Sequence, residues 1–232
     1  RHTRSLCDWS SDVCSSDLQR FLSTELNLLH LIDYVSKAIN ESKFCIGIFL
    51  DLQKAFDVVN HEILLKKLFK LGIRGSELGW FDNFLKNRNQ FVHINGCNST
   101  NRTINMSVLQ GSVLGPILFL CFINDLHLSN NCLSLLFADN TACLKSRKNL
   151  NELISLVNTE VQKLAHWFRT NKLAVNVSKT KYIIFRPKGM KINDDTSEVV
   201  FNDNSPGQPN DPSSVTRLIR VYNDNPDKNN RT

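Results

Sequence analysis

Residues 44–57 read FCIGIFLDLQKAFD, a continuous apolar run that ends abruptly at Asp51. A short apolar run of this kind is typical of a strand that is buried on both faces. The stretch therefore predicts a core strand with a carboxylate at its end, and Phe56 and Asp57 follow shortly after it. Taken alone, an aspartate at a strand end more often caps a turn than binds a ligand.

A second stretch, residues 133–144, reads LSLLFADNTACL and places Asp139 and Asn140 between two short apolar runs. Two strands joined tightly there would form a hairpin with both residues at its tip. Because the strands gather around Asp139 and are not each followed by a helix, an antiparallel sheet is favoured over a parallel, doubly wound one. We expect an α+β fold in which the strands bearing Asp51 and Asp139 lie side by side, with helices packed behind the sheet. Two such carboxylates would suit hard divalent cations, which prefer oxygen ligands.

The rest of the chain alternates between helical periodicity and short strand-like runs. Amphipathic patterns predict helices at residues 24–39, 61–71, 77–85 and 150–168, and an apolar run of helix length predicts another at residues 114–128. In the first of these helices the apolar stripe consists of Leu28, Leu29, Ile32, Val35 and Ile39. Strands are expected at residues 90–94 and 103–108, paired with each other and with a turn at Asn95-Gly96, and at residues 181–185. Residues 189–232 are rich in Asn, Asp, Ser and Pro, and this composition predicts a polar, poorly ordered excursion. Within it, only residues 199–201 and 218–222 have a strand-like pattern.

Composition narrows the class of protein. The chain has 232 residues, is 41% hydrophobic and carries a formal net charge of +6, which suits a phosphate-bearing partner without proving one. Its seven cysteines are scattered and form no C-x-x-C pair, so we expect reduced thiols in an intracellular protein rather than a zinc site or a disulfide scaffold. No apolar run approaches the ~20 residues of a membrane span, and no signal peptide is visible.

The first residues of the chain have a different character. Residues 8–18 read DWSSDVCSSDL, show no periodicity and resemble the translation of a sequencing-library adapter. We therefore expect residues 1–18 to be an artefact or a disordered tail and assign them no function.

Four ordered motifs carry a family resemblance. They are DLQKAFD at residues 51–57, LQGSVLGP at 109–116, FADN at 137–140 and NVSKTK at 176–181. In order and spacing they resemble the catalytic motifs of reverse transcriptases of the non-LTR (LINE-like) retrotransposon family, and the similarity runs over about residues 21–188. The resemblance implies that residues 19–188 form a polymerase palm, with an antiparallel sheet backed by helices, together with part of the fingers. It also implies that a primer-contacting segment and a thumb would follow residues 189–232.

The resemblance assigns roles to the acidic motifs. Asp51 and Asp139 would bind metal, with the backbone carbonyl of Leu52 as a further ligand. Phe56 would lie under the sugar of the incoming nucleotide and exclude a 2′-hydroxyl by steric clash. The alternative for Phe56 is an ordinary core aromatic.

Three further residues would line the nucleotide and template side of the same site: Gln110, Gly111 and Ser112. Lys179 would protonate pyrophosphate or orient the triphosphate. The alternative for the first three residues is an ordinary glycine turn that precedes a helix. The alternative for Lys179 is a solvated surface charge.

The implied cofactors are two Mg²⁺ ions, with Mn²⁺ as a substitute, and the implied partners are an RNA template, a DNA primer and deoxynucleoside triphosphates. The resemblance also implies an intracellular protein, in the cytoplasm as a ribonucleoprotein and in the nucleus, with no membrane partner. Several basic stretches could follow the template–primer backbone: Lys66-Lys67, residues 86–88, residues 145–148 and residues 186–188. Three aromatic residues on amphipathic helices, Trp80, Phe81 and Trp167, are expected in the core rather than as base-stacking platforms.

Two positions depart from the family pattern. Asn140 stands where the family has a second aspartate, and Leu109 replaces a proline that restricts the turn. Because Asn140 removes one negative charge from the metal site, we expect reduced polymerase activity. The alternatives to an active RNA-directed DNA polymerase are therefore a catalytically decayed remnant and a non-enzymatic RNA-binding module.

Overall fold

The structure is a computed structural model that describes residues 24–86, 88–109, 111–137, 140–190, 192, 198–202 and 215–221. Gln110 and Asp139 lie outside the described residues, as do residues 1–18 and most of residues 203–232. The expectations for the two ends of the chain therefore stay predictions.

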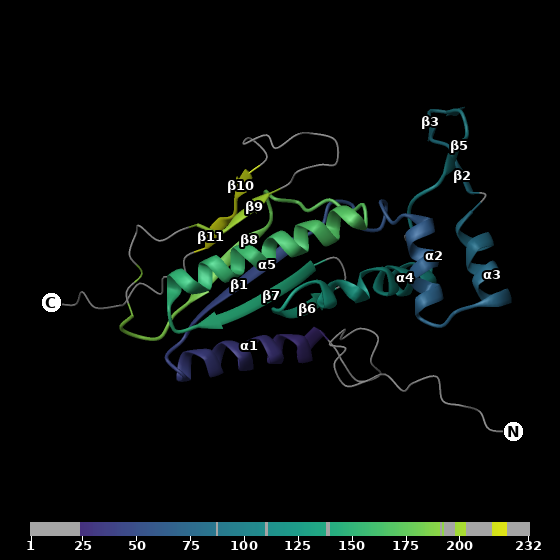
Figure 1. Ribbon diagram of the computed structural model, residues 1–232. Helices are drawn as coiled ribbons and strands as arrows, with labels where there is room; N and C mark the ends of the chain where they lie inside the picture. The colour runs from purple at the N-terminus through teal and green to yellow at the C-terminus, as the bar shows by residue number, and fades with distance from the viewer. Residues whose placement is uncertain are drawn as a thin grey trace, which may run out of the picture.

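A mixed five-stranded sheet forms the centre of the fold, with strand order β11-β8-β1-β7-β6 (Figure 1). The strands are β1 (Phe44–Asp51), β6 (Leu133–Phe137), β7 (Asn140–Arg147), β8 (Lys181–Phe185) and β11 (Ile219–Val221). Strand β1 is antiparallel to both of its neighbours, β7 and β8, and β11 alone among these strands joins in parallel. The predicted antiparallel arrangement of the acidic strands is confirmed.

The apolar run of β1 is continuous because helices cover both faces of the sheet. Helix α5 (Leu150–Thr170) packs on one face and helix α1 (Thr24–Asn40) on the other (Figure 1). Ile46 and Ile48 belong to the large core under α5, whereas Cys45 belongs to the smaller core under α1. Burial raises the pKa of the Cys45 thiol to about 12, as expected for a cysteine used as a packing residue.

Helix α1 uses a different face from the one that the sequence predicts. Val35 is buried, but Leu28, Leu29 and Ile32 are exposed by half or more. In their place Asn27 is buried and donates a hydrogen bond from Nδ2 to the carbonyl of Leu136 at 3.1 Å. The predicted stripe is therefore wrong for its N-terminal half.

A second group of elements lies beside the sheet. It consists of α2 (His61–Lys70), α3 (Gly75–Leu85), α4 (Leu114–Ile123) and the 3-10 helix η1 (Asn124–Ser129). Helix α2 packs between α4 and α3, and α3 lies on the outer side of α2, away from the sheet (Figure 1). The single helix expected at residues 114–128 is thus an α-helix that continues as a 3-10 helix.

The hairpin that extends from α3 consists of two short ladders instead of one. Strand β2 (Arg88–Gln90) pairs with β5 (Arg102–Ile104), and β3 (His93–Ile94) pairs with β4 (Cys97–Asn98). The predicted turn is confirmed, since Asn95 and Gly96 have φ values of 51° and 79°, as a tight type I′ turn requires. A separate pair, β9 (Val200–Asn202) and β10 (Val215–Arg217), lies against α5 through β9.

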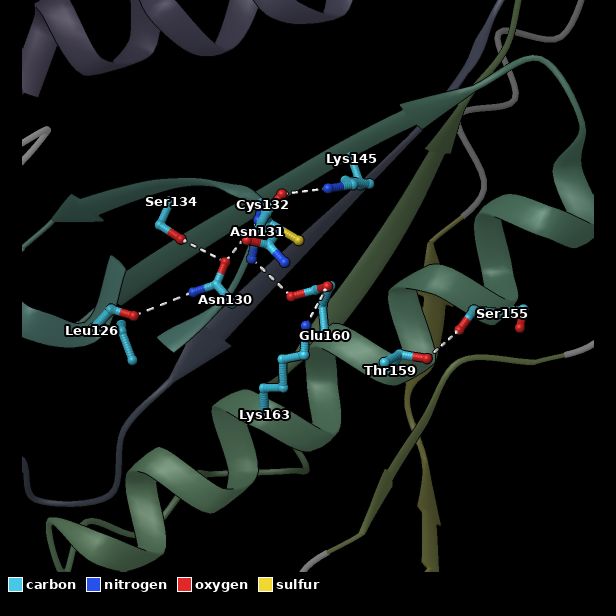
Figure 2. Close-up of polar contacts among 10 residues, drawn as sticks. All are labelled: Leu126, Asn130, Asn131, Cys132, Ser134, Lys145, Ser155, Thr159, Glu160 and Lys163. Carbon is cyan, nitrogen blue, oxygen red and sulfur yellow. Dashed lines mark hydrogen bonds and ion pairs between the residues drawn. The ribbon is translucent and has the colours of Figure 1, made fainter. Parts of the chain in front are cut away.

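A polar network fixes the chain where it enters β6 (Figure 2). Glu160 of α5 is buried and accepts the backbone N–H of Asn131 at 2.7 Å, and it pairs with Lys163 at 2.9 Å. Asn130 accepts from the backbone N–H of Cys132 at 2.9 Å and from the Ser134 hydroxyl at 3.2 Å. The start of the β6–β7 hairpin is therefore tied to the helix behind the sheet. In the described part of the chain, no helix is both long and apolar enough to cross a membrane.

Candidate active site

The end of β1 lies beside the β6–β7 hairpin. Asp51 is the antiparallel partner of Asn140, and Asn140 is in turn the partner of Phe137. Directly opposed residues of antiparallel strands project on the same face, with Cβ atoms about 5 Å apart. Asp51 and Asn140 are therefore neighbours, although the sequence analysis paired Asp51 with Asp139. Asn140 is the first residue of β7 rather than part of the hairpin tip, because it pairs with Phe137 in the β6–β7 ladder.

The backbone of Asp51 is held from the opposite side by residues that precede β8. The N–H of Asn176 donates to the carbonyl of Asp51 at 2.7 Å, and the N–H of Asp51 donates to the Thr180 hydroxyl at 3.4 Å. The fully buried Thr180 hydroxyl donates to the carbonyl of Asn176 at 2.9 Å. Asn176 and Thr180 thus fix the position of the carboxylate. Sequence reasoning assigned neither of them a role, although both lie inside the NVSKTK motif.

Leu52 continues this arrangement by one residue. It pairs as an isolated bridge with Val175, and the N–H of Gln53 donates to the carbonyl of Ala174 at 2.9 Å. In such a pair the bonds come from the flanking residues, so the N–H and C=O of the paired residue point to the other side. The carbonyl of Leu52 therefore faces the β7 side, where a metal ligand would be needed; its role as a ligand stays a prediction.

Lys179 completes a small cleft at this edge of the sheet. Its ammonium lies 3.9 Å from Oδ2 of Asp51, and its side chain is 70% exposed. The cleft has a volume of about 240 Å³ and is lined by Phe49, Leu50, Asp51, Phe137, Asn140, Thr141, Ala142 and Lys179. The structure thus brings together three of the predicted site residues. Because Lys179 is exposed, water screens this ion pair, and the pair contributes little to the stability of the fold.

Phe56 lies apart from the lining of that cleft. Its ring centroid is 4.7 Å from that of Phe119 on α4, and its carbonyl accepts the N–H of Val108 at 2.8 Å. The ring is half-buried against the large core. Phe56 therefore serves at least as a packing aromatic, and its predicted contact with a sugar stays a prediction.

The turn before α4 is built around Ser112 and two glycines. The Ser112 hydroxyl donates to the carbonyl of Leu109 at 2.8 Å and accepts the N–H of Gly115 at 2.9 Å. Gly111 has a φ of 83°, which favours glycine, and a Cβ on Gly115 would lie 2.3 Å from the carbonyl oxygen of Leu109. Gly115 is thus a steric requirement that the sequence reasoning did not single out. Leu109 still forms a closed turn without the proline.

Two expectations about basic and aromatic residues need correction. Lys67 is buried and donates to Asp125 at 2.6 Å and to the carbonyl of Phe122 at 2.7 Å, so it cannot follow a nucleic-acid backbone. Burial lowers the pKa of its ammonium group, and the Asp125 partner opposes that shift. Trp167 is buried as predicted, but Trp80 is 53% exposed, so its assignment to the core is wrong.

The metal-binding potential of the site depends on oxygen atoms. Asp51 supplies a carboxylate, Asn140 an amide and Leu52 a carbonyl, which are the ligand types that Mg²⁺ and Mn²⁺ accept. Within the described ranges, no three His, Cys, Asp or Glu side chains gather in a way that could hold a metal ion. The second predicted carboxylate, Asp139, lies outside those ranges.

Comparison with known proteins gives a consistent answer. The reverse transcriptase (RNA-dependent DNA polymerase) family profile matches residues 5–213. A probable RNA-directed DNA polymerase from transposon BS of Drosophila melanogaster is 32% identical over 166 residues, which are 68% of this chain and 18% of that protein. The RNA-directed DNA polymerase from mobile element jockey of the same species is 28% identical over 170 residues, which are 70% of this chain and 18% of that protein.

The fold comparison agrees. A telomerase from Candida tropicalis, solved with a fragment of telomeric RNA, superposes with a TM-score of 0.54 at 12% identity and covers 70% of this chain and 29% of the telomerase chain. This likeness concerns the fold alone. The chain spans about a fifth of the length of the two transposon relatives, at 18% of each. The matched family profile and these relatives show that the chain belongs to the reverse transcriptase family, among the enzymes of non-LTR retrotransposons.

Proposed function

We propose that this chain is the polymerase core of an RNA-directed DNA polymerase, which adds deoxynucleotides to a DNA primer along an RNA template. The main support is that Asp51 and Asn140 face each other across β1 and β7, and that the ammonium of Lys179 lies 3.9 Å from the Asp51 carboxylate. Family membership supports the chemistry, because reverse transcriptases depend on divalent metal ions. A pure RNA-binding module would not need a carboxylate in a cleft meant for phosphates, and the relatives do not favour a decayed remnant.

The residues have distinct tasks in this proposal. Two bound divalent cations would activate the primer hydroxyl and stabilise the leaving pyrophosphate. Asp51, Asp139 and the carbonyl of Leu52 would hold them, and Asp139 is assigned because it is joined to Asn140 by one peptide bond. Lys179 would neutralise charge on the triphosphate as the bond to the leaving group breaks. Phe56 would limit the space at the sugar, and Gln110, Gly111 and Ser112 would line the template side.

The proposed metal binding and primer extension depend on which residue stands at position 140. Asn140 is the cross-strand neighbour of Asp51, so an aspartate here would add a negative charge next to the first carboxylate. Hard cations bind more tightly as the charge of their oxygen ligands increases. The natural chain should therefore bind Mg²⁺ weakly and extend primers slowly, and Asn140→Asp should improve both.

The test is primer extension on an RNA template with Mg²⁺ and, in parallel, Mn²⁺. Asp51→Asn and Asp139→Asn should each abolish extension, Asn140→Asp should raise it at least tenfold, and the control Asp33→Asn, an exposed acid on α1, should leave it unchanged. Equal extension by the natural chain and Asp51→Asn would contradict the proposal. Manganese binding followed by electron paramagnetic resonance separates loss of the metal from loss of the template. Residence in the cytoplasm as a ribonucleoprotein and in the nucleus stays a prediction from the resemblance.

A further inference from the structure

The outer helix α3 carries an ordered aromatic column at the surface. Trp80 and Phe84 are one helical turn apart on the same face, and their rings are stacked at 5.5 Å between centroids and 12° between planes. The guanidinium carbon of Arg88 lies 4.3 Å from the centroid of Phe84. Trp80, Phe84 and Arg88 together form what we call the Trp80 column. Its outer member, Trp80, is 53% exposed.

The indole of Trp80 is fixed by its neighbours. Phe81 meets it edge-on at 5.1 Å and 82°, while Phe84 supports one of its faces. Phe81 and Phe84 are half-buried against the large core, so they anchor the column, whereas Trp80 does not belong to that core. An indole held in place by two rings loses little conformational freedom when a planar ligand stacks on it.

The basic residues around the column outnumber the acidic ones and suit an anionic ligand with planar groups. Arg88 stacks on Phe84, and Asp82 is paired with Lys86 at 2.7 Å, while the exposed Glu77 lies one turn before Trp80. A second ring–guanidinium pair lies at the start of the same helix, where Arg74 is 4.9 Å from the ring of Phe69, a residue that is itself half exposed. Aromatic faces alternating with guanidinium groups are the chemistry that binds unpaired nucleobases and their phosphates.

We propose that the Trp80 column is a binding site for unpaired bases of single-stranded nucleic acid, apart from the catalytic cleft. A single strand offers free base faces to Trp80, and its phosphates can approach Arg88; a duplex keeps its base faces inside the stack. An apolar protein segment fits less well, because it would bury guanidinium groups without providing an anion. The inference goes beyond the proposed function, and its test does not depend on catalysis.

The experiment measures the affinity of the intact chain for a fluorescent single-stranded RNA of about ten nucleotides and for the matching duplex, by anisotropy. Trp80→Ala should weaken single-strand binding about tenfold or more and leave duplex binding within about twofold, since one stacked base contributes most of that difference. Trp80→Phe should retain most of the affinity because it keeps a ring. Arg88→Lys should reduce it about threefold, because the charge stays but the planar group is lost.

The control is Leu128→Ala, which removes an exposed apolar side chain from the end of η1 and should not change either affinity. Circular dichroism melting checks that each variant is folded. Equal single-strand affinity of the natural chain and Trp80→Ala would overturn the inference. An equal loss for single strand and duplex would overturn it too, as would an effect of Trp80→Ala limited to self-association in light scattering. Because Asp51→Asn should leave the RNA affinity intact, failure of this inference and failure of the polymerase proposal are distinguishable.

Discussion

The end of β1 and the hairpin beyond α3 are built in opposite ways. Around Asp51 the backbone is bonded on both sides, to β7 and to residues 174–180, and the neighbouring side chains Leu50, Leu52 and Thr180 are buried. The hairpin instead depends on ladders of two or three residues, and its apolar side chains Phe91, Val92 and Ile94 are more than half exposed. The first region has its geometry imposed by the whole sheet, whereas the second depends on local contacts. The same kind of substitution should therefore change the free energy of unfolding more in the first region than in the second.

The largest effect is expected from the core of β1. Ile48 is 1% exposed and belongs to the core under α5, so Ile48→Ala leaves a cavity that the packed sheet and helix cannot fill. The free energy of unfolding should fall by about 3 kcal/mol. Denaturant titration followed by circular dichroism measures this loss. A loss below about 1 kcal/mol would mean that the sheet is as adaptable as the hairpin.

The next effect separates a buried hydroxyl from an exposed one. Thr180→Val keeps the shape of the side chain but removes the hydroxyl that donates to Asn176 and accepts from Asp51, and a loss of about 1–2 kcal/mol is expected. The matched control is Thr103→Val in β5, where an exposed hydroxyl donates to Asn89 at 3.1 Å and water can replace the bond. The control should change stability by less than about 0.5 kcal/mol. If thermal melting shows that Thr180→Val and Thr103→Val lose similar amounts of stability, the distinction between the buried and the exposed hydroxyl is wrong.

The same contrast explains what the sequence could predict. The strand at residues 44–51 and the carboxylate at its end follow from a continuous apolar run, because that signal is local. The direct pairing of Asp51 with Asn140 depends on the register between two strands that are far apart in the chain. The burial of Lys67 depends on Asp125 and Phe122, which are 58 and 55 residues away in the chain. Lys67 lies on the same helix face as the buried Leu64 and Leu68, but nothing near it in the sequence shows that Asp125 and Phe122 would be there to accept from its ammonium group.

Other features were unpredictable for a similar reason. Periodicity shows that a helix such as α1 has an apolar stripe, but only the docking of the helix on the sheet decides which face is covered, here the one with Asn27, Val35 and Ala38. The polar residues Asn176 and Thr180 matter through backbone atoms of Asp51, and a backbone contact leaves no residue-type signal between the two segments. Trp80 has the residue type of a core position, and its exposure reflects the place of α3 at the edge of the molecule.

A third prediction concerns the pH dependence of the contacts that Glu160 makes at the start of the β6–β7 hairpin. Burial alone would raise the pKa of Glu160, but the N–H of Asn131 and the ammonium of Lys163 outweigh it and hold that pKa below its ordinary value of 4.5. A depressed carboxyl pKa stabilises the fold above about pH 4.5 and loses that contribution as the pH falls through the folded value. Glu160→Gln should therefore cost about 1 kcal/mol at pH 7 and much less well below pH 4. Melting temperatures of the natural chain and of Glu160→Gln, measured across this pH range, test whether the two stabilities converge at low pH. A stability difference that does not change with pH would contradict the prediction.

The smallest effect is expected at the tip of the hairpin beyond α3. Ile94 is 63% exposed, pairs only with Cys97 in a two-residue ladder, and is next to the turn formed by Asn95 and Gly96. Ile94→Ala removes little buried surface, so the free energy of unfolding should change by less than about 0.5 kcal/mol, although the residue is as apolar as Ile48. Gly96→Val is the sharper companion, because its positive φ of 79° penalises a β-branched residue and should loosen the turn alone. Hydrogen exchange should then speed up in the hairpin while β1 and β7 keep their protection; faster exchange in β1 would show that the two regions are coupled.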